Sequence, residues 1–205
     1  MRINLQKLGK RFNREWIFRN LSFQFEPAYK CAITGPNGSG KSTLLQIIGG
    51  ASLSNEGSLT YEMDGKVLAH DQVFRKISFA APYLELIEEM TLVEFFSFHQ
   101  RMKGWIPSVT QKDIIREINL ERASHKQIRY YSSGMKQRVK LGQAIFSDVP
   151  VVLLDEPLTN LDKEGMLTYH SLVRNFCSDR MVIVSSNDPQ EYSFCDKVIH
   201  LLEYK

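Results

Sequence analysis

The sequence contains few cysteines and no long hydrophobic run. Its three cysteines, Cys31, Cys177 and Cys195, stand far apart without metal-type or redox-type spacing, which favours reduced thiols in a reducing compartment. The longest apolar runs, residues 151–154 and 181–184, fall far short of the ~20 residues that a spanning helix needs. The basic N-terminal residues are not followed by the apolar stretch of a secretory signal. We therefore expect a cytoplasmic protein that reaches a membrane only through another chain.

Strong net charge, internal repeats and low-complexity segments are also absent. Lys and Arg number 26 against 23 Asp and Glu, and the net charge of +3 is too small for a nucleic-acid-binding surface. We therefore expect no nucleic-acid partner. A chain of 205 residues with 43% hydrophobic content can bury one substantial core, which predicts a single domain over residues 1–205.

The first 80 residues show a strand-like pattern with one helix inserted. Residues 20–25 alternate in polarity, residues 30–34 form a compact apolar run, and the Asp-Gly pair at 64–65 marks a hairpin turn. The helix is predicted to follow Lys41 and to end at the glycine pair 49–50.

The middle third, residues 83–147, changes to a helical period. Thr91 with Glu94 forms a capping box, residues 110–113 offer a weaker helix start, and residues 135–146 predict a third helix.

The last third alternates buried strands with helices. We expect strands at 151–154 and 181–184, a helix over 162–176 and a short final helix opened by Asp188 and Pro189.

This order of elements predicts an α/β fold, a doubly wound core with an N-terminal antiparallel β part and a helical insertion. We assign residues 1–82 and 147–205 to the nucleotide-binding core and residues 83–146 to the helical part.

A phosphate-binding motif lies between the apolar run 30–34 and the first predicted helix. Its glycines let backbone amides turn toward a β-phosphate, and the helix N-terminus adds a favourable dipole. Lys41 supplies positive charge to the β- and γ-phosphates, and Ser42 supplies an oxygen to Mg²⁺. The predicted cofactors are therefore ATP and Mg²⁺. The residues of this site are Gly35, Pro36, Asn37, Gly38, Ser39, Gly40, Lys41, Ser42 and Thr43.

Two carboxylates, Asp155 and Glu156, follow the buried strand 151–154. Open α/β sheets bind ligands at this end of a strand. We expect Asp155 to hold the metal and Glu156 to accept a proton from the attacking water.

The segment 131–138, Tyr-Ser-Ser-Gly-Met-Lys-Gln-Arg, resembles the signature motif of the ATP-binding-cassette (ABC) ATPases. The resemblance runs from about residue 2 to residue 202 and includes the order of phosphate motif, helical insertion, signature and acidic pair. It implies a P-loop NTPase fold with a RecA-like core. It also implies a head-to-tail dimer in which the signature of one subunit covers the γ-phosphate of the other, through Ser132, Ser133, Gly134 and Met135.

The resemblance implies further site residues. An aromatic that stacks on adenine corresponds to Phe12, with Trp16 as a neighbouring alternative, and either ring can instead belong to the core. Asp162 corresponds to a residue that touches the opposing subunit, and it also suits a helix N-cap.

Five positions depart from the family pattern. Pro82 stands where the family carries a glutamine that contacts metal and water. Glu85 either reaches the site through a rearrangement of the loop or is a solvated loop carboxylate. Asn187 replaces the histidine that contacts the γ-phosphate, so we expect slower hydrolysis. Asn187 is equally suited to be a turn residue before Asp188. The signature carries Ser133 and Met135 where the family most often has glycine and glutamine. Ala28 replaces a common glycine before the first core strand.

The resemblance implies an ATPase subunit of a transporter, peripheral on the cytoplasmic face of the membrane. Its implied partners are a second copy or a paralogous cassette and an integral-membrane permease. A groove near residues 80–104 would receive the permease, where aromatic side chains either form a docking surface or fill the core. These aromatics are Phe95, Phe96, Phe98 and Trp105. The alternative function is a nucleotide-gated interaction module with little turnover.

Overall fold

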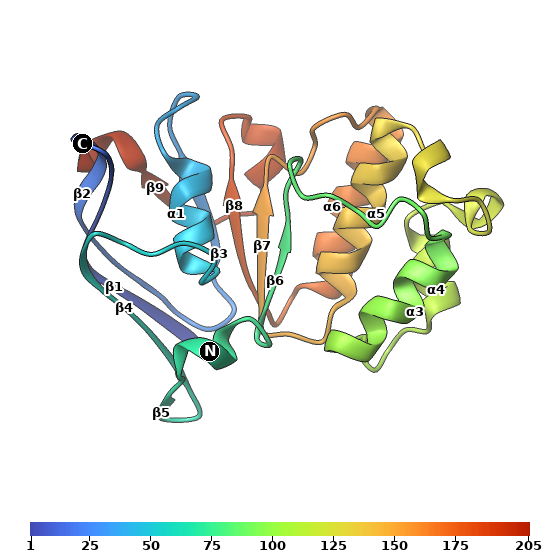
Figure 1. The fold of residues 1–205 in the computed structure, drawn as a ribbon, viewed down its shortest axis with the longest axis horizontal. Helices are drawn as coiled ribbons and strands as arrows, with labels where there is room; N and C mark the ends of the chain where they lie inside the picture. Colours follow the sequence, from blue (N-terminus) through green and yellow to red (C-terminus); the bar gives the residue numbers. More distant parts are fainter.

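A computed structural model describes all residues of the chain, 1–205, as two sheets with helices around them. The N-terminal sheet is antiparallel and has the strand order β2-β1-β4-β5. Its strands are β1 (Arg2–Phe12), β2 (Glu15–Phe25), β4 (Glu56–Met63) and β5 (Lys66–Val67). Figure 1 shows this sheet at one end of the molecule, on the left.

The second sheet is entirely parallel and has the order β6-β7-β8-β3-β9. Its strands are β3 (Lys30–Thr34), β6 (Ile77–Ala80), β7 (Val151–Asp155), β8 (Met181–Ser185) and β9 (Lys197–His200). Every residue of β7 and of β8 is buried, as expected for strands covered on both faces. Polar residues that follow β3 and β7 therefore lie at the same end of the sheet, beyond the carboxyl ends of its strands.

Helices pack on both faces of the parallel sheet and extend beyond it. The α-helices are α1 (Lys41–Ile48), α2 (His70–Val73), α3 (Leu92–Lys103), α4 (Gln111–Glu117), α5 (Ser133–Phe146) and α6 (Lys163–Phe176). Four short 3-10 helices complete the chain: η1 (Glu121–Ala123), η2 (Ile128–Tyr130), η3 (Pro189–Tyr192) and η4 (Leu201–Tyr204). In Figure 1, α3 and α4 lie at the end of the molecule opposite the antiparallel sheet. No helix is both long and apolar enough to cross a membrane.

The two faces of the parallel sheet contribute to two separate hydrophobic clusters. Along β7, Val151 and Leu153 belong to the cluster shared with α1 and the antiparallel sheet. Val152 and Leu154 belong to the cluster shared with α5, α6 and the helical segment. This division follows from the two-residue period of a strand, which points successive side chains to opposite faces.

Most of the predicted elements are present. The capping boxes at Thr91 and Thr110 both form, and Asp188 caps η3 by accepting a hydrogen bond from the Gln190 amide. The predicted third helix begins two residues earlier than expected, at Ser133, because the Ser132 side chain caps it. The mixed α/β fold with its antiparallel part and helical insertion is confirmed.

Candidate nucleotide-binding site

The phosphate motif forms the turn between β3 and α1, as its spacing predicts. Gly40 adopts a left-handed conformation with φ of 101° immediately before α1. A Cβ atom at this position would lie 2.2 Å from Ile17 Cγ2, so the turn leaves no space for a side chain. The backbone amides at the start of α1 are thereby free to receive an anion.

Lys41 is buried inside this turn, with 5% of its surface exposed. Its ammonium donates hydrogen bonds to the carbonyl oxygens of Gly35, at 2.8 Å, and Pro36, at 3.3 Å. These neutral carbonyls satisfy the donors without neutralising the charge. The buried positive charge is therefore available to a phosphate that enters the turn.

A cavity of about 290 Å³ opens over the turn and brings the predicted site residues together. It is lined by Phe12, Ile17, Asn37, Gly38, Gly40, Lys41, Ser42, Thr43 and Glu156. Ile17, which nothing in the sequence singled out, forms part of its wall because β2 passes beside the turn. The acidic residue Glu156 thus shares one cavity with the ammonium of Lys41.

Phe12 and Trp16, the two candidates for stacking on adenine, have different surroundings. The Phe12 ring is 53% exposed and lines the cavity, with the Lys10 ammonium 5.1 Å from its centroid. The Trp16 ring lies between two guanidinium groups, at 4.4 Å from Arg19 and 5.5 Å from Arg11. Only the Phe12 ring has a face open to the cavity.

Asp155 ends β7 and is 1% exposed, and neither of its carboxylate oxygens has a hydrogen-bond partner. A buried carboxylate without donors is costly unless a cation or an ordered group accompanies it. Ser42 is the second residue of α1, where its hydroxyl can serve as an oxygen ligand. Two hard oxygen ligands beside a phosphate site fit Mg²⁺, which keeps most of its waters.

Glu156 follows directly and holds a left-handed backbone, with φ of 42°. Its amide donates to the Ser185 carbonyl oxygen at 2.9 Å, which extends the pairing of β7 with β8 by one residue. Strained backbone of this kind is common where a side chain must be aimed at a site.

Asn187 lies over the phosphate turn. Its side-chain amide donates to Asn37 Oδ1 at 2.9 Å. Asn187 also precedes the Asp188 cap of η3, so the turn role and the contact with the phosphate loop coexist in one residue.

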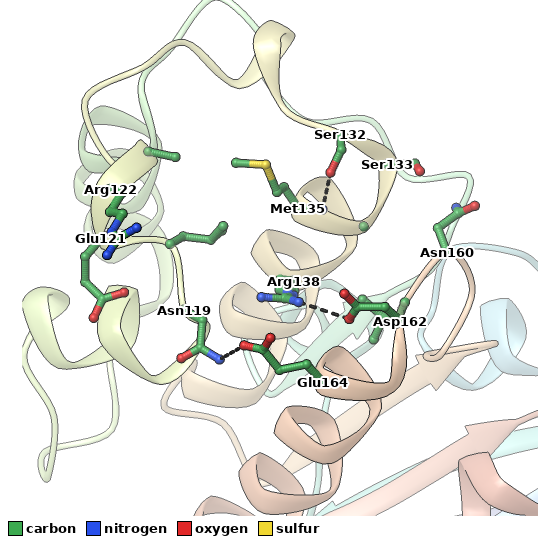
Figure 2. A pocket seen from close by; sticks show the side chains of 14 residues that line it. Asn119, Glu121, Arg122, Ser132, Ser133, Met135, Arg138, Asn160, Asp162 and Glu164 are labelled. Carbon is green, nitrogen blue, oxygen red and sulfur yellow. Dashed lines mark hydrogen bonds and ion pairs between the residues drawn. The ribbon is translucent and has the colours of Figure 1, made fainter.

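The signature residues line a different and larger cavity, of about 670 Å³, shown in Figure 2. Ser132 caps α5 by accepting from the Met135 amide, which leaves the Ser133 hydroxyl exposed at the helix start. A Cβ atom at Gly134 would lie 2.8 Å from the Asn160 carbonyl oxygen, so this position requires close backbone approach. The two cavities share no lining residue.

Asp162 borders the same cavity and has two partners. Its Oδ1 accepts from the Gly165 amide at 2.8 Å, which caps α6, and from the Arg138 guanidinium at 3.1 Å. The backbone hydrogen bond, followed by the charge of Arg138, lowers the pKa of the Asp162 carboxyl. The predicted N-cap is therefore formed. Figure 2 shows that Arg138, which was not among the predicted site residues, points toward the cavity.

The loop that follows β6 departs from the expected site geometry. The Pro82 carbonyl oxygen accepts from the Lys140 ammonium of α5. Glu85 lines a cavity with Lys136 and Lys140, apart from the nucleotide cavity. Tyr83, which the sequence reading passed over, accepts a hydrogen bond from the Gln46 amide of α1 at 3.1 Å.

The four aromatics of the predicted permease groove are divided between core and surface. Phe95, Phe96 and Trp105 are buried, and only Phe98 is exposed. Of the two alternatives, core and docking surface, the core holds for three of these rings: Phe95 and Phe96 are buried residues of α3, and the Trp105 ring that follows α3 packs against Phe96.

Comparison with known proteins identifies the family. The family model described as ABC transporter matches residues 18–159. The cytochrome c biogenesis ATP-binding export protein CcmA of Mesorhizobium japonicum is 30% identical over 190 residues, which cover 91% of each chain. The ABC transporter ATP-binding protein YybJ of Bacillus subtilis is 29% identical, over 97% of this chain and 92% of that one. YxlF of the same organism is 29% identical over 96% of this chain, which spans only 66% of its length.

Solved structures agree with the fold. A dimeric ATP-binding cassette in a post-hydrolysis state with ADP and Pi superposes with a TM-score of 0.83, at 23% identity, over 97% of this chain and 93% of that one. An ATP-binding subunit of an ABC transporter gives 0.83 at 22% identity, over 98% and 87%. The chain therefore belongs to the ABC transporter family, as an ATP-binding and ATP-hydrolysing cassette.

Proposed function

We propose that two copies of this cassette, or one copy and a paralogous cassette, close head to tail around two molecules of ATP with Mg²⁺. The observation that carries this proposal is the separation of the phosphate turn and the signature start into two cavities with no residue in common. Each is an anion-binding helix N-terminus, and one triphosphate can lie between them only when they come from different chains.

Within each composite site the residues of this chain have separate roles. Lys41 leaves the loop carbonyls for the β- and γ-phosphates, and the exposed start of α5 in the second copy presents Ser133 and its backbone amides to the γ-phosphate. Asp155 and Ser42 hold Mg²⁺, which supplies charge neutralisation on the phosphate oxygens. Glu156 takes the proton of the attacking water, and Asn187 donates an amide hydrogen bond near the γ-phosphate.

We further propose that closure acts on an integral-membrane permease, with the cassette peripheral on the cytoplasmic face. Exposed apolar side chains on α3 and on the loop after β6 support this docking. They are Tyr83, Leu84, Ile87, Phe98 and Met102, which are all between 37% and 65% exposed. Two of them, Phe98 and Met102, line a cavity of about 260 Å³ together with Phe79 and other residues. A short amphipathic helix of the permease fits a surface with this apolar composition.

The central experiment uses the Glu156→Gln variant, which keeps the shape of the side chain and removes the proton acceptor. With ATP and Mg²⁺ the variant should run as a dimer in size-exclusion chromatography with light scattering, and with EDTA as a monomer. Its steady-state turnover should fall by about 10²- to 10⁴-fold, the usual contribution of a general base. A variant that stays monomeric at saturating ATP and Mg²⁺ would remove the basis of the proposal.

A second candidate function is a nucleotide-gated module that dimerises but barely turns over. It is favoured by Pro82, which has no side-chain ligand, and by Asn187, which carries no charge. Equal turnover by the wild type and Glu156→Gln, combined with dimerisation of both, would select the module.

A further inference from the structure

The carboxylate of Asp155 poses a question that the residues assigned so far leave open. Both of its oxygens are buried and without a donor, and a metal ion directed at one oxygen would leave the other without a partner. Pro82, at the position expected to supply an amide, offers no side-chain donor and its carbonyl is held by Lys140.

The strand register brings the start of the loop after β6 to the end of β7, where Asp155 lies. β6 and β7 are parallel neighbours, and Ala80 lies opposite Leu154. The loop from Ala81 onward therefore leaves the sheet at the edge where Asp155 ends β7. Tyr83 is the first residue of this loop whose side chain carries a hydroxyl.

The Tyr83 hydroxyl is oriented from α1. It accepts from the Gln46 amide at 3.1 Å, which leaves its own proton free to be donated elsewhere. Gln46 is four residues after Ser42 in α1, so both side chains lie on one face of the helix. The hydroxyl is thereby held one helical turn from a predicted metal ligand.

The electrostatics agree with this placement. Burial, and to a smaller degree the negative charge of Asp155, raise the pKa of the Tyr83 hydroxyl to about 12. The carboxylate of Asp155 is therefore close enough to act on the Tyr83 hydroxyl.

We propose that Tyr83 is a positioning residue of the metal site: in the nucleotide-loaded protein its hydroxyl, held by Gln46, donates to the carboxylate of Asp155. This inference rests on the proposed function, because it assumes that Asp155 serves a metal. The hydrogen bond fixes one carboxylate oxygen and leaves the other directed at the metal. The Lys140 contact at Pro82 holds the loop from the other side, so that little ordering is required when nucleotide binds.

The test measures metal binding directly. Full-length protein is loaded with ATP in the Glu156→Gln background, and free Mn²⁺ is followed by electron paramagnetic resonance during a Mn²⁺ titration. Tyr83→Phe removes only the hydroxyl and should weaken Mn²⁺ binding by about 3- to 10-fold, the effect of one lost hydrogen bond. ATP affinity in EDTA, measured by calorimetry, should stay within about twofold of the parent. Gln46→Leu removes the group that orients the hydroxyl but keeps the hydroxyl. Its Mn²⁺ affinity should lie between that of the parent and that of Tyr83→Phe.

Tyr130→Phe is the matched control, since Tyr130 is exposed and outside both cavities. It should bind Mn²⁺ like the parent. Unchanged Mn²⁺ affinity in Tyr83→Phe would overturn the inference, as would an equal loss of ATP affinity in EDTA, which would make the hydroxyl merely structural. If the parent binds ATP equally with and without metal, it is the proposed function that fails.

Discussion

The phosphate turn and the signature start are both helix N-termini, yet they differ in how complete they are within one chain. At the turn, the buried Lys41 and the carboxylate residue Glu156 already line one small cavity, and the buried carboxylate of Asp155 directly precedes Glu156 in the chain. At the signature, a wider cavity presents an exposed serine at the start of α5 and is lined by charges of both signs, among them Arg122 and Arg138. The guanidinium of Arg138 is paired with Asp162 of the same chain.

This difference indicates where the binding energy of each half originates. The turn is organised before nucleotide arrives, because Lys41 and Gly40 are fixed by contacts within the chain. The signature start, in contrast, meets a phosphate only when another chain carries the nucleotide. One half should therefore be sensitive to substitutions that alter folding, and the other to substitutions that alter association.

The largest expected effect comes from placing one defect in each half. Lys41→Ala removes the phosphate charge, and Ser133→Asp places a negative charge against the γ-phosphate while remaining compatible with a helix N-terminus. Each variant alone should lose at least about 100-fold in ATP turnover, the scale of a lost charge-assisted contact. An equimolar mixture should recover roughly a quarter of wild-type turnover, because half of the dimers contain one intact composite site.

Turnover of purified mixtures by a coupled assay checks this prediction. Ser133→Ala removes the hydroxyl without adding a charge, so it is the control for the charge and should lose much less turnover than Ser133→Asp. A mixture no more active than its components would mean that the turn and the signature do not meet across chains.

Next in size is the effect of adding one methyl group to each half. Gly40→Ala forces a left-handed conformation on alanine and a contact with Ile17, and it should cost about 2–4 kcal/mol of unfolding free energy. Gly134→Ala places its Cβ atom 2.8 Å from the Asn160 backbone carbonyl oxygen, which must shift, but it needs no left-handed conformation and gains helix propensity, so its cost should be smaller, about 1–2 kcal/mol. Urea unfolding followed by circular dichroism compares the two. Equal losses would contradict the view that only the turn is organised by folding.

The sequence allowed the organised half to be predicted almost entirely. The glycine spacing, the strand before Lys41 and the run before Asp155 are local patterns, and each forces a conformation by itself. The assignments that stayed open depend on contacts between distant segments. Phe12 lines the cavity, whereas the Trp16 ring is contacted by Arg11 of the neighbouring strand and by Arg19 of its own strand. Ile17 enters the cavity because β2 passes beside the turn. The role of Tyr83 depends on parallel pairing of β6 with β7, which no spacing in the sequence reveals.

A change of pH should loosen the signature half before the turn. His99 of α3 is buried against α5, where its Nδ1 accepts from the Gln143 amide at 3.2 Å and its Nε2 donates to the Ser147 hydroxyl at 2.8 Å. This arrangement requires neutral imidazole, and burial, with the charge of Lys103, lowers the pKa of His99 to about 4. The unfolded chain takes up a proton below about pH 6.5 while the folded chain does not, so stability is present above that pH and is lost as the pH falls.

Between pH 7 and pH 5 the free energy of unfolding should fall by about 2 kcal/mol. The fall should be smaller in His99→Gln, whose side chain cannot be protonated. Urea unfolding at several pH values measures it. Amide exchange should locate the first opening at the contact of α3 with α5. The same pH dependence in both proteins would assign the loss to other groups.

The smallest expected effect separates the two aromatic candidates at the turn. Phe12→Ala removes a ring that lines the nucleotide cavity, and it should weaken ATP binding by about 2- to 10-fold, the worth of one stacking contact. Trp16→Ala removes a ring already covered by Arg11 and Arg19, and it should lower stability while leaving the ATP dissociation constant unchanged. Phe12→Trp offers a larger ring and should bind ATP at least as tightly as the wild type. Calorimetric titration with ATP measures all three variants, and a loss confined to Trp16→Ala would move the adenine from the first ring to the second.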